Sequence, residues 1–253
     1  MIEIMDCVSG YLVFSIFIFW TSLITNIAHQ LLKERSLLLM RPVCRSCDAR
    51  LSWYDVVPVI SYIFFRGKCR LCASPKSFLY LALDVFGAVV FTACFYYEHG
   101  VLEYAPVIFL LKILFISALI MAIRTDLEEM VILRVSTIYL IPVWFFFSLM
   151  NCLEINFYTS FFGALLGYFI PWFAGKLYRF VRGVDGIGVG DFELLAMIGA
   201  FVGPARMLDS MIWGCAGALV FGVVYALLFA RGRGVRIPFA PFLSLGALFE
   251  LFR

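Results

Sequence analysis

Charged side chains are scarce in this chain of 253 residues. Asp, Glu, Lys and Arg make up 15% of it, whereas 64% of its residues are hydrophobic. An average soluble domain has about 25% charged residues. An apolar excess of this size cannot be buried in one globular core. The composition therefore excludes a soluble domain, a disordered chain and a secreted disulfide scaffold. It predicts a polytopic membrane protein.

Eight segments are apolar enough to be read as membrane-spanning helices, since a span needs roughly 20 mostly apolar residues. None alternates as a barrel strand does, so the expected fold is all-α. The sixth segment is short and ends in Gly203-Pro204, so a half-helix or re-entrant segment is the alternative there. The first lacks a basic n-region and a cleavage site, and we interpret it as a retained span. The expected spans are residues 8–29, 79–97, 105–123, 135–150, 157–175, 187–203, 207–230 and 237–252.

Lys and Arg are concentrated in alternate loops, which hold 17 of the 20 basic residues. The positive-inside rule places these loops in the cytoplasm and both termini outside. It also explains the basic loops without a nucleic-acid partner, so we expect membrane lipid and no nucleic acid around the chain. The largest soluble piece is then a cytoplasmic insertion over residues 30–78, within one membrane domain spanning residues 1–253. The 17 residues are Lys33, Arg35, Arg41, Arg45, Arg50, Arg66, Lys68, Arg70, Lys76, Arg124, Arg134, Lys176, Arg179, Arg182, Arg231, Arg233 and Arg236.

Four of the eight cysteines form two C-x2-C pairs in this insertion, Cys44 with Cys47 and Cys69 with Cys72. Four thiolates at this spacing suit a closed tetrahedral zinc site. Some fifty residues hold too little core to be stable alone, and a metal supplies what packing cannot. Disulfides are disfavoured in a reducing compartment. A redox pair or an iron–sulfur cluster remains the alternative to structural zinc.

Two aspartates fall at the cytoplasmic ends of different expected helices. Asp126 lies just past the third one, in RTDLEEMVI, and Asp191 opens the sixth one after Gly188-Val189-Gly190. Taken singly, Asp126 can be a solvated loop charge and Asp191 a helix N-cap. Taken together, two carboxylates at close range do not both ionise readily. The ionised one can then activate water while the protonated one polarises a carbonyl, as in an aspartic protease.

Several motifs give the chain a resemblance to a known family. Residues 188–191 match the GxGD motif of intramembrane aspartyl proteases. The segment CRSCDARLSWYDVVPVISYIFFRGKCRLC resembles the C-x2-C…WYD-x2-P…RG-x-C-x2-C insertion of the prepilin peptidases, also called type IV leader peptidases. GAFVG and IPFAPFLSLG match that family further along the chain. The resemblance covers nearly the whole sequence in order.

This resemblance implies a bifunctional enzyme of the bacterial inner membrane. It would cleave the short basic leader of prepilin-like proteins of type IV pili or type II secretion. It would then methylate the new N-terminus with S-adenosylmethionine. By carry-over, Asp126 and Asp191 are the catalytic pair, Gly188 and Gly190 are the motif glycines, and the zinc ligands are Cys44, Cys47, Cys69 and Cys72.

Three regions of the chain depart from the family pattern. The family usually has Pro-Asp where this chain has Leu133-Arg134, and Lys where it has Glu193. In the first helix, TSLITNIAHQ keeps Asn26 but lacks the family's glycine. A peptidase without methyltransferase activity is therefore a second hypothesis. A third is a transporter or assembly factor whose carboxylates relay protons or ions.

Overall fold

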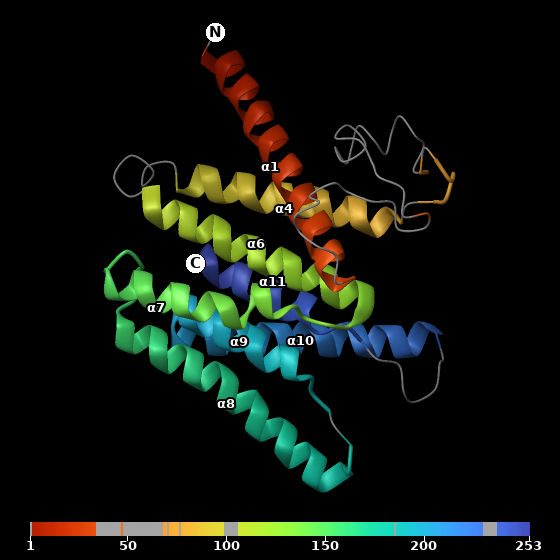
Figure 1. The fold of residues 1–253 in the computed structure, drawn as a ribbon, viewed down its shortest axis with the longest axis vertical. Coiled ribbons are helices and arrows are strands. Elements are labelled where there is room, and N and C mark those ends of the chain that lie inside the picture. The colour runs from red at the N-terminus through yellow and green to blue at the C-terminus, as the bar shows by residue number, and fades with distance from the viewer. Residues whose placement is uncertain are drawn as a thin grey trace. The chain divides into compact units, whose positions relative to one another are not determined.

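The computed structural model of the protein describes residues 2–33, 47, 68, 69, 71–75, 77–98, 106–184, 186–229 and 237–253. Over these residues the fold is helical (Figure 1). No strand forms in the part of the chain so described, where the nearest approach is an isolated bridge between Lys68 and Pro75. The expectation of an all-α chain is confirmed to this extent. Most of the expected insertion over residues 30–78, including Cys44, lies outside the described residues.

The chain divides inside one helix into two compact units, residues 1–124 and 125–253. The first unit contains α1 (Ile2–Leu32), α4 (Phe78–Tyr97) and most of α6 (Pro106–Glu129). The helix α4 begins at Ser77, whose hydroxyl accepts a hydrogen bond from the Leu79 N–H and caps the first turn. Stacked rings of Phe17 and Phe91 lie between α1 and α4.

Two polar contacts inside the first unit satisfy ionisable groups that the sequence places within apolar segments. The Thr25 hydroxyl donates to Asp84 at 2.8 Å, and Lys112 pairs with Glu98 at 2.8 Å. All four side chains are buried. Because a buried charge is costly unless it is paired or hydrogen-bonded, these contacts account for Asp84 and Lys112 as structural residues.

The described part of the second unit contains the last turn of α6, two 3₁₀ turns and five further helices. In Figure 1, α8 lies beside α9 and α7, and α10 packs along α11. Asn156 caps α8 by accepting from the Thr159 N–H, and Gly183 ends it in the left-handed conformation. The elements are η2 (Arg134–Ser136), η3 (Ile138–Leu140), α7 (Ile141–Leu149), α8 (Phe157–Arg182), α9 (Val189–Val202), α10 (Pro204–Phe229) and α11 (Ala240–Leu251).

The helices α8 and α9 approach each other closely at glycines. A Cβ atom added at Gly163 would overlap the Gly199 carbonyl group, and one added at Gly167 would overlap the Leu195 carbonyl group. Glycines that let backbones touch are the usual basis of tight helix pairing in membranes. Gly163 and Gly167 thus allow α8 and α9 to pack closely. This contact fixes α9, and hence Asp191, against the rest of the second unit.

Helix lengths bear on the eight expected spans. Five helices of the described chain are long and apolar enough to cross a membrane: Gly10–Leu32, Phe78–Tyr97, Pro106–Glu129, Phe157–Arg182 and Pro204–Leu228. The segments Arg134–Leu149 and Ala240–Leu251 are shorter apolar helices, and α9 has only 14 residues. At 1.5 Å per residue, 14 residues span about 21 Å, short of a hydrocarbon core of about 30 Å. Eight complete spans are not confirmed.

Candidate active site and metal centre

Asp126 lies inside α6, near its C-terminal end. The expectation that it follows the third helix is wrong, because that helix continues to Glu129 and ends at Met130, whose φ is 54°. Asp126 is also buried rather than a solvated loop charge. Its Oδ2 accepts a hydrogen bond of 2.8 Å from the N–H of Ala240, the first residue of α11. Since the first N–H groups of a helix have no partner within it, Asp126 caps α11 from another part of the chain.

Asp191 lies in the first turn of α9, three residues after Gly188. Gly188 is the N-cap residue of this helix, so the interpretation of Asp191 as the N-cap is wrong by three positions. The backbone N–H of Asp191 donates to the Gly188 carbonyl at 3.2 Å. Burial of the carboxyl group, followed by the charge of Asp126, raises the pKa of Asp191 to about 7. Asp191 is therefore a carboxyl group that exchanges a proton near neutral pH.

The two motif glycines leave room for neighbours of Asp191. A Cβ atom at Gly190 would lie 3.0 Å from the Cβ of Ile132, closer than side chains normally approach. At Gly188 it would lie 3.3 Å from Oδ2 of Asp191 itself. The glycine at position 190 thus allows the chain after α6 to lie against the start of α9.

One cavity brings the predicted catalytic residues together. It has a volume of about 280 Å³, and both Asp126 and Asp191 line it. These residues are 65 positions apart in the chain and come from different helices. The rest of the lining is supplied by Met130, Val131, Ile132, Arg134, Gly188, Val189, Gly190 and Glu193.

A buried acidic side chain and an exposed basic one meet at this cavity. Nε of Arg134 lies 3.6 Å from Oε1 of Glu193, and the Thr137 hydroxyl lies 3.4 Å from Oε2 of Glu193. The Glu193 side chain is 6% exposed and that of Arg134 is 70% exposed. Arg134 and Thr137 were not expected in the site from the sequence. The only signal was that Arg134 and Glu193 both depart from the family pattern.

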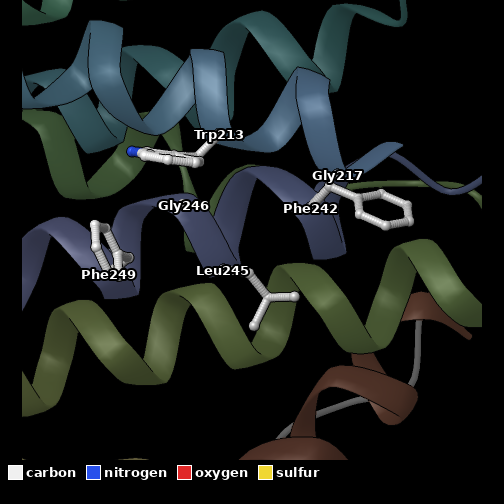
Figure 2. A pocket seen from close by; sticks show the side chains of 6 residues that line it. All are labelled: Trp213, Gly217, Phe242, Leu245, Gly246 and Phe249. Atoms are coloured by element: carbon white, nitrogen blue, oxygen red, sulfur yellow. The ribbon is translucent and has the colours of Figure 1, made fainter. Parts of the chain in front are cut away.

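A second cavity in the same unit lies between α10 and α11 and is apolar. Figure 2 shows Trp213 extending from α10 and Phe242, Leu245 and Phe249 extending from α11. Its volume is about 270 Å³. It contains no charged side chain, so it offers no chemistry for acid–base catalysis.

Three of the four predicted metal ligands lie together. The Sγ atoms of Cys47, Cys69 and Cys72 are all within 4.8 Å of one another. The fourth, Cys44, lies outside the described residues. The pair from Cys69 to Cys72 is held in a tight turn, in which the Cys69 N–H donates to Ser74 O and the Ala73 N–H donates to Cys69 O, each at 2.9 Å. Three converging thiols are a donor set that zinc prefers.

Cys72 is poised to ionise. Its Sγ lies 3.1 Å from the Ser74 hydroxyl oxygen. The side chain of Ser74, followed by its backbone, lowers the pKa of the Cys72 thiol to about 6. Because metals bind the thiolate rather than the thiol, this turn favours the ligating form of Cys72.

Comparison with known proteins gives the family. Residues 13–98 match the model of the bacterial peptidase A24 N-terminal domain, and residues 113–230 match that of the type IV leader peptidase family. A protein from Dichelobacter nodosus named prepilin leader peptidase/N-methyltransferase is 29% identical over 221 residues, covering 87% of this chain and 74% of its own. Proteins of the same name from Bacillus subtilis and Pseudomonas aeruginosa are 27% and 28% identical, covering 84% and 85% of this chain and 82% and 72% of their own. No solved structure matches the chain.

The described residues include five helices of membrane-spanning length, and two peptidase family models match the chain, so the protein is a multi-pass membrane peptidase. More particularly, the chain belongs to the type IV leader peptidase family, and the resemblance to the prepilin peptidases is confirmed.

Proposed function

We propose that the protein is an aspartic endopeptidase in which Asp126 and Asp191 share the catalytic work. The observation that carries this proposal is that the two carboxyl groups line one cavity although 65 positions separate them in the chain. An aspartic peptidase needs one ionised carboxylate to take a proton from water and one protonated carboxyl group to polarise the scissile carbonyl. Two acidic groups and a water molecule suffice for this reaction, and no metal takes part in it.

The surroundings of the two aspartates suggest how the roles divide. Asp126 is buried, and the hydrogen bond that it accepts from the Ala240 N–H offsets part of the cost of ionising it. Asp191 has a pKa of about 7 and holds the shared proton at or below neutral pH. Helix dipoles do not distinguish the two, since Asp191 lies in the first turn of α9 and Asp126 caps α11. We therefore assign Asp126 as the base and Asp191 as the acid of the first step.

The proposed substrates are prepilin-like proteins of type IV pili or type II secretion. The names of the relatives support this class. Such a substrate has a short basic leader followed by a hydrophobic helix. We propose that cleavage follows a glycine on the cytoplasmic face of the bacterial inner membrane. We assign the basic loops and the insertion over residues 30–78 to the cytoplasmic side because of their charge. We assign the rest of the chain to one membrane domain because of its hydropathy.

N-methylation of the new terminus, with S-adenosylmethionine as donor, is the second proposed activity. The relatives' printed name includes N-methyltransferase. The first helix retains Asn26, whose side chain donates to Ser22 O at 2.7 Å. The same helix lacks the family's glycine in TSLITNIAHQ, an observation that favours a peptidase without methylation as the alternative.

We further propose a structural zinc ion at the cysteine cluster. Cys47, Cys69 and Cys72 would supply three thiolates, and Cys44 is proposed as the fourth ligand. A metal at this position would hold together a small polar segment that has little core of its own.

Co-expression with a prepilin, followed by mass analysis of the pilin N-terminus, tests both activities. Loss of the leader with a mass increase of one methyl group supports the bifunctional enzyme. Complete cleavage that leaves an unmethylated amine supports the alternative. A prepilin that keeps its leader in the presence of the wild-type chain contradicts the peptidase assignment.

A further inference from the structure

We propose that Arg134 and Glu193 form a positioning ion pair that sets the relation between the two aspartates, and that this pair works with its charges in either order. The inference rests on the proposed peptidase function. The pair bridges the segment after α6 and the first turns of α9, and thus joins the chain that follows Asp126 to the chain that follows Asp191.

The segment over residues 130–137 is held near its start by contacts with both aspartate-bearing helices. At its start, the Met130 N–H donates to Asp126 O at 3.0 Å, and the left-handed φ of Met130 turns the chain away from α6. Further along, Ile132 lies against Gly190, where a Cβ atom on the glycine would be only 3.0 Å from the Cβ of Ile132. The segment is therefore fastened to the helix of one aspartate and lies against the helix of the other.

Glu193 makes the polar contacts that hold this segment on α9. One carboxylate oxygen of Glu193 is approached by Arg134 and the other by Thr137, and both of these residues belong to the segment. Glu193 is buried, so its charge needs compensation, and Arg134 is the cation that supplies it. Because Glu193 follows Asp191 by two residues on the same short helix, a shift of this contact moves Asp191 relative to Asp126.

The contact needs opposite charges and does not depend on which position holds which charge. The structure shows that positions 134 and 193 face each other, with a cation at the first and an anion at the second. Because two opposite charges attract equally in either order, an anion at position 134 and a cation at position 193 should restore the pair.

Charge-reversal variants of the full chain test the pair in membranes, with a prepilin that the wild type cleaves as substrate. Glu193→Lys leaves two cations facing each other, and Arg134→Asp leaves two anions. Each single variant should lower kcat about tenfold or more with a smaller change in KM, as expected when contacting charges are coupled. The double variant Arg134→Asp/Glu193→Lys should recover kcat to within about threefold of the wild type.

The pH–rate profile separates positioning from a general loss of folding. The charged groups that line the cavity are Asp126, Arg134, Asp191 and Glu193. Glu193→Lys adds positive charge beside the aspartates, so the alkaline limb of the profile should move to lower pH. Arg134→Asp adds negative charge, so the limb should move to higher pH. The double variant should return the limb to its wild-type position, whereas misfolding would lower the rate without opposite shifts.

Glu154 and Arg206 provide a matched control. They form an ion pair of 3.3 Å in the same unit, half-exposed on both sides and away from the cavity lining. Exchange of their charges should change neither kcat nor the pH profile. If the wild type is active but the double variant of Arg134 and Glu193 is as inactive as the single variants, the ion-pair proposal is wrong. That result leaves the proposed peptidase function standing. A wild type that cleaves no prepilin overturns both.

Discussion

The backbone N–H of Ala240 donates to Oδ2 of Asp126 across 2.8 Å, and it joins residues that are 114 positions apart. Ala240 lies within IPFAPFLSLG, a motif that the sequence shares with its family but that contains no titratable side chain. Through this contact the motif positions Asp126. The first turn of α11 holds one oxygen of Asp126 in place at the cavity that this residue lines.

Replacement of either aspartate by asparagine is expected to abolish prepilin cleavage. Asparagine keeps the size of the side chain but neither takes a proton from water nor donates one to a carbonyl oxygen. Loss of a general acid or base lowers rates by about 10²–10⁴-fold. Cleavage is measured by the gel shift and mass of the pilin after co-expression, with Asp126→Asn and Asp191→Asn compared at equal membrane levels.

Asp209 offers a control for these two substitutions. It is half-exposed and pairs with Arg253 at 3.6 Å, outside the cavity lining. Asp209→Asn should therefore process the pilin normally. Normal processing by Asp126→Asn or Asp191→Asn would refute the two-aspartate mechanism.

The rate of cleavage should fall as pH rises above about 7. Asp191, with its pKa near 7, is protonated below this value and ionised above it. If it supplies the proton to the scissile carbonyl, each further pH unit lowers the rate about tenfold. The measurement is kcat/KM of the purified enzyme from pH 5.5 to 9, with gel filtration at each pH to show that the protein stays folded. A rate that stays level or rises to pH 9 contradicts the role given to Asp191.

The helical class of the fold was predictable from the sequence because apolar length is a local property. The end of α6 was not. Hydropathy falls after residue 123, yet Arg-Thr-Asp-Leu-Glu-Glu continues the helix to Glu129. A helix is held by hydrogen bonds within its own backbone, so it continues through polar residues that hydropathy alone places in a loop. Asp126 consequently lies one turn deeper in a helix than expected.

Contacts made by the backbone, and contacts between charges far apart in the chain, also could not be predicted from the sequence. Ala240 contributes an N–H that every non-proline residue has, so nothing in its side chain marks it as a partner of Asp126. Arg134 and Glu193 looked like two unrelated departures until the fold placed them 3.6 Å apart. Long-range pairing depends on how helices pack, which residue types alone do not determine.

The glycine contact between α8 and α9 predicts a sharp difference between two substitutions in one helix. Gly167→Ala would place a Cβ atom against the Leu195 carbonyl group, so the helices must separate and the protein should lose stability by about 1–3 kcal/mol. At Gly175 the nearest atom to a new Cβ is 3.4 Å away, in Phe192, which is ordinary contact. Gly175→Ala should therefore be neutral or stabilising by about 0.5–1 kcal/mol, because alanine favours the helix. Thermal unfolding in detergent compares the two, and equal melting temperatures would contradict the close packing.

Replacing single cysteines should distinguish those that bind the metal from those that do not. Cys69→Ser replaces a buried thiol of the three-sulfur cluster and is expected to lower the zinc content of the purified protein from about one ion per chain to a small fraction of that. Cys215→Ser changes a free thiol on α10 and should leave the zinc content unchanged. Zinc is measured by elemental analysis after purification without chelator. The protease resistance of the insertion is measured on the same samples. This resistance should fall with the zinc content, both in Cys69→Ser and in the chelator-treated wild type. A folded, protease-resistant wild type that contains no metal would show that the cluster is held by its own hydrogen bonds and not by zinc.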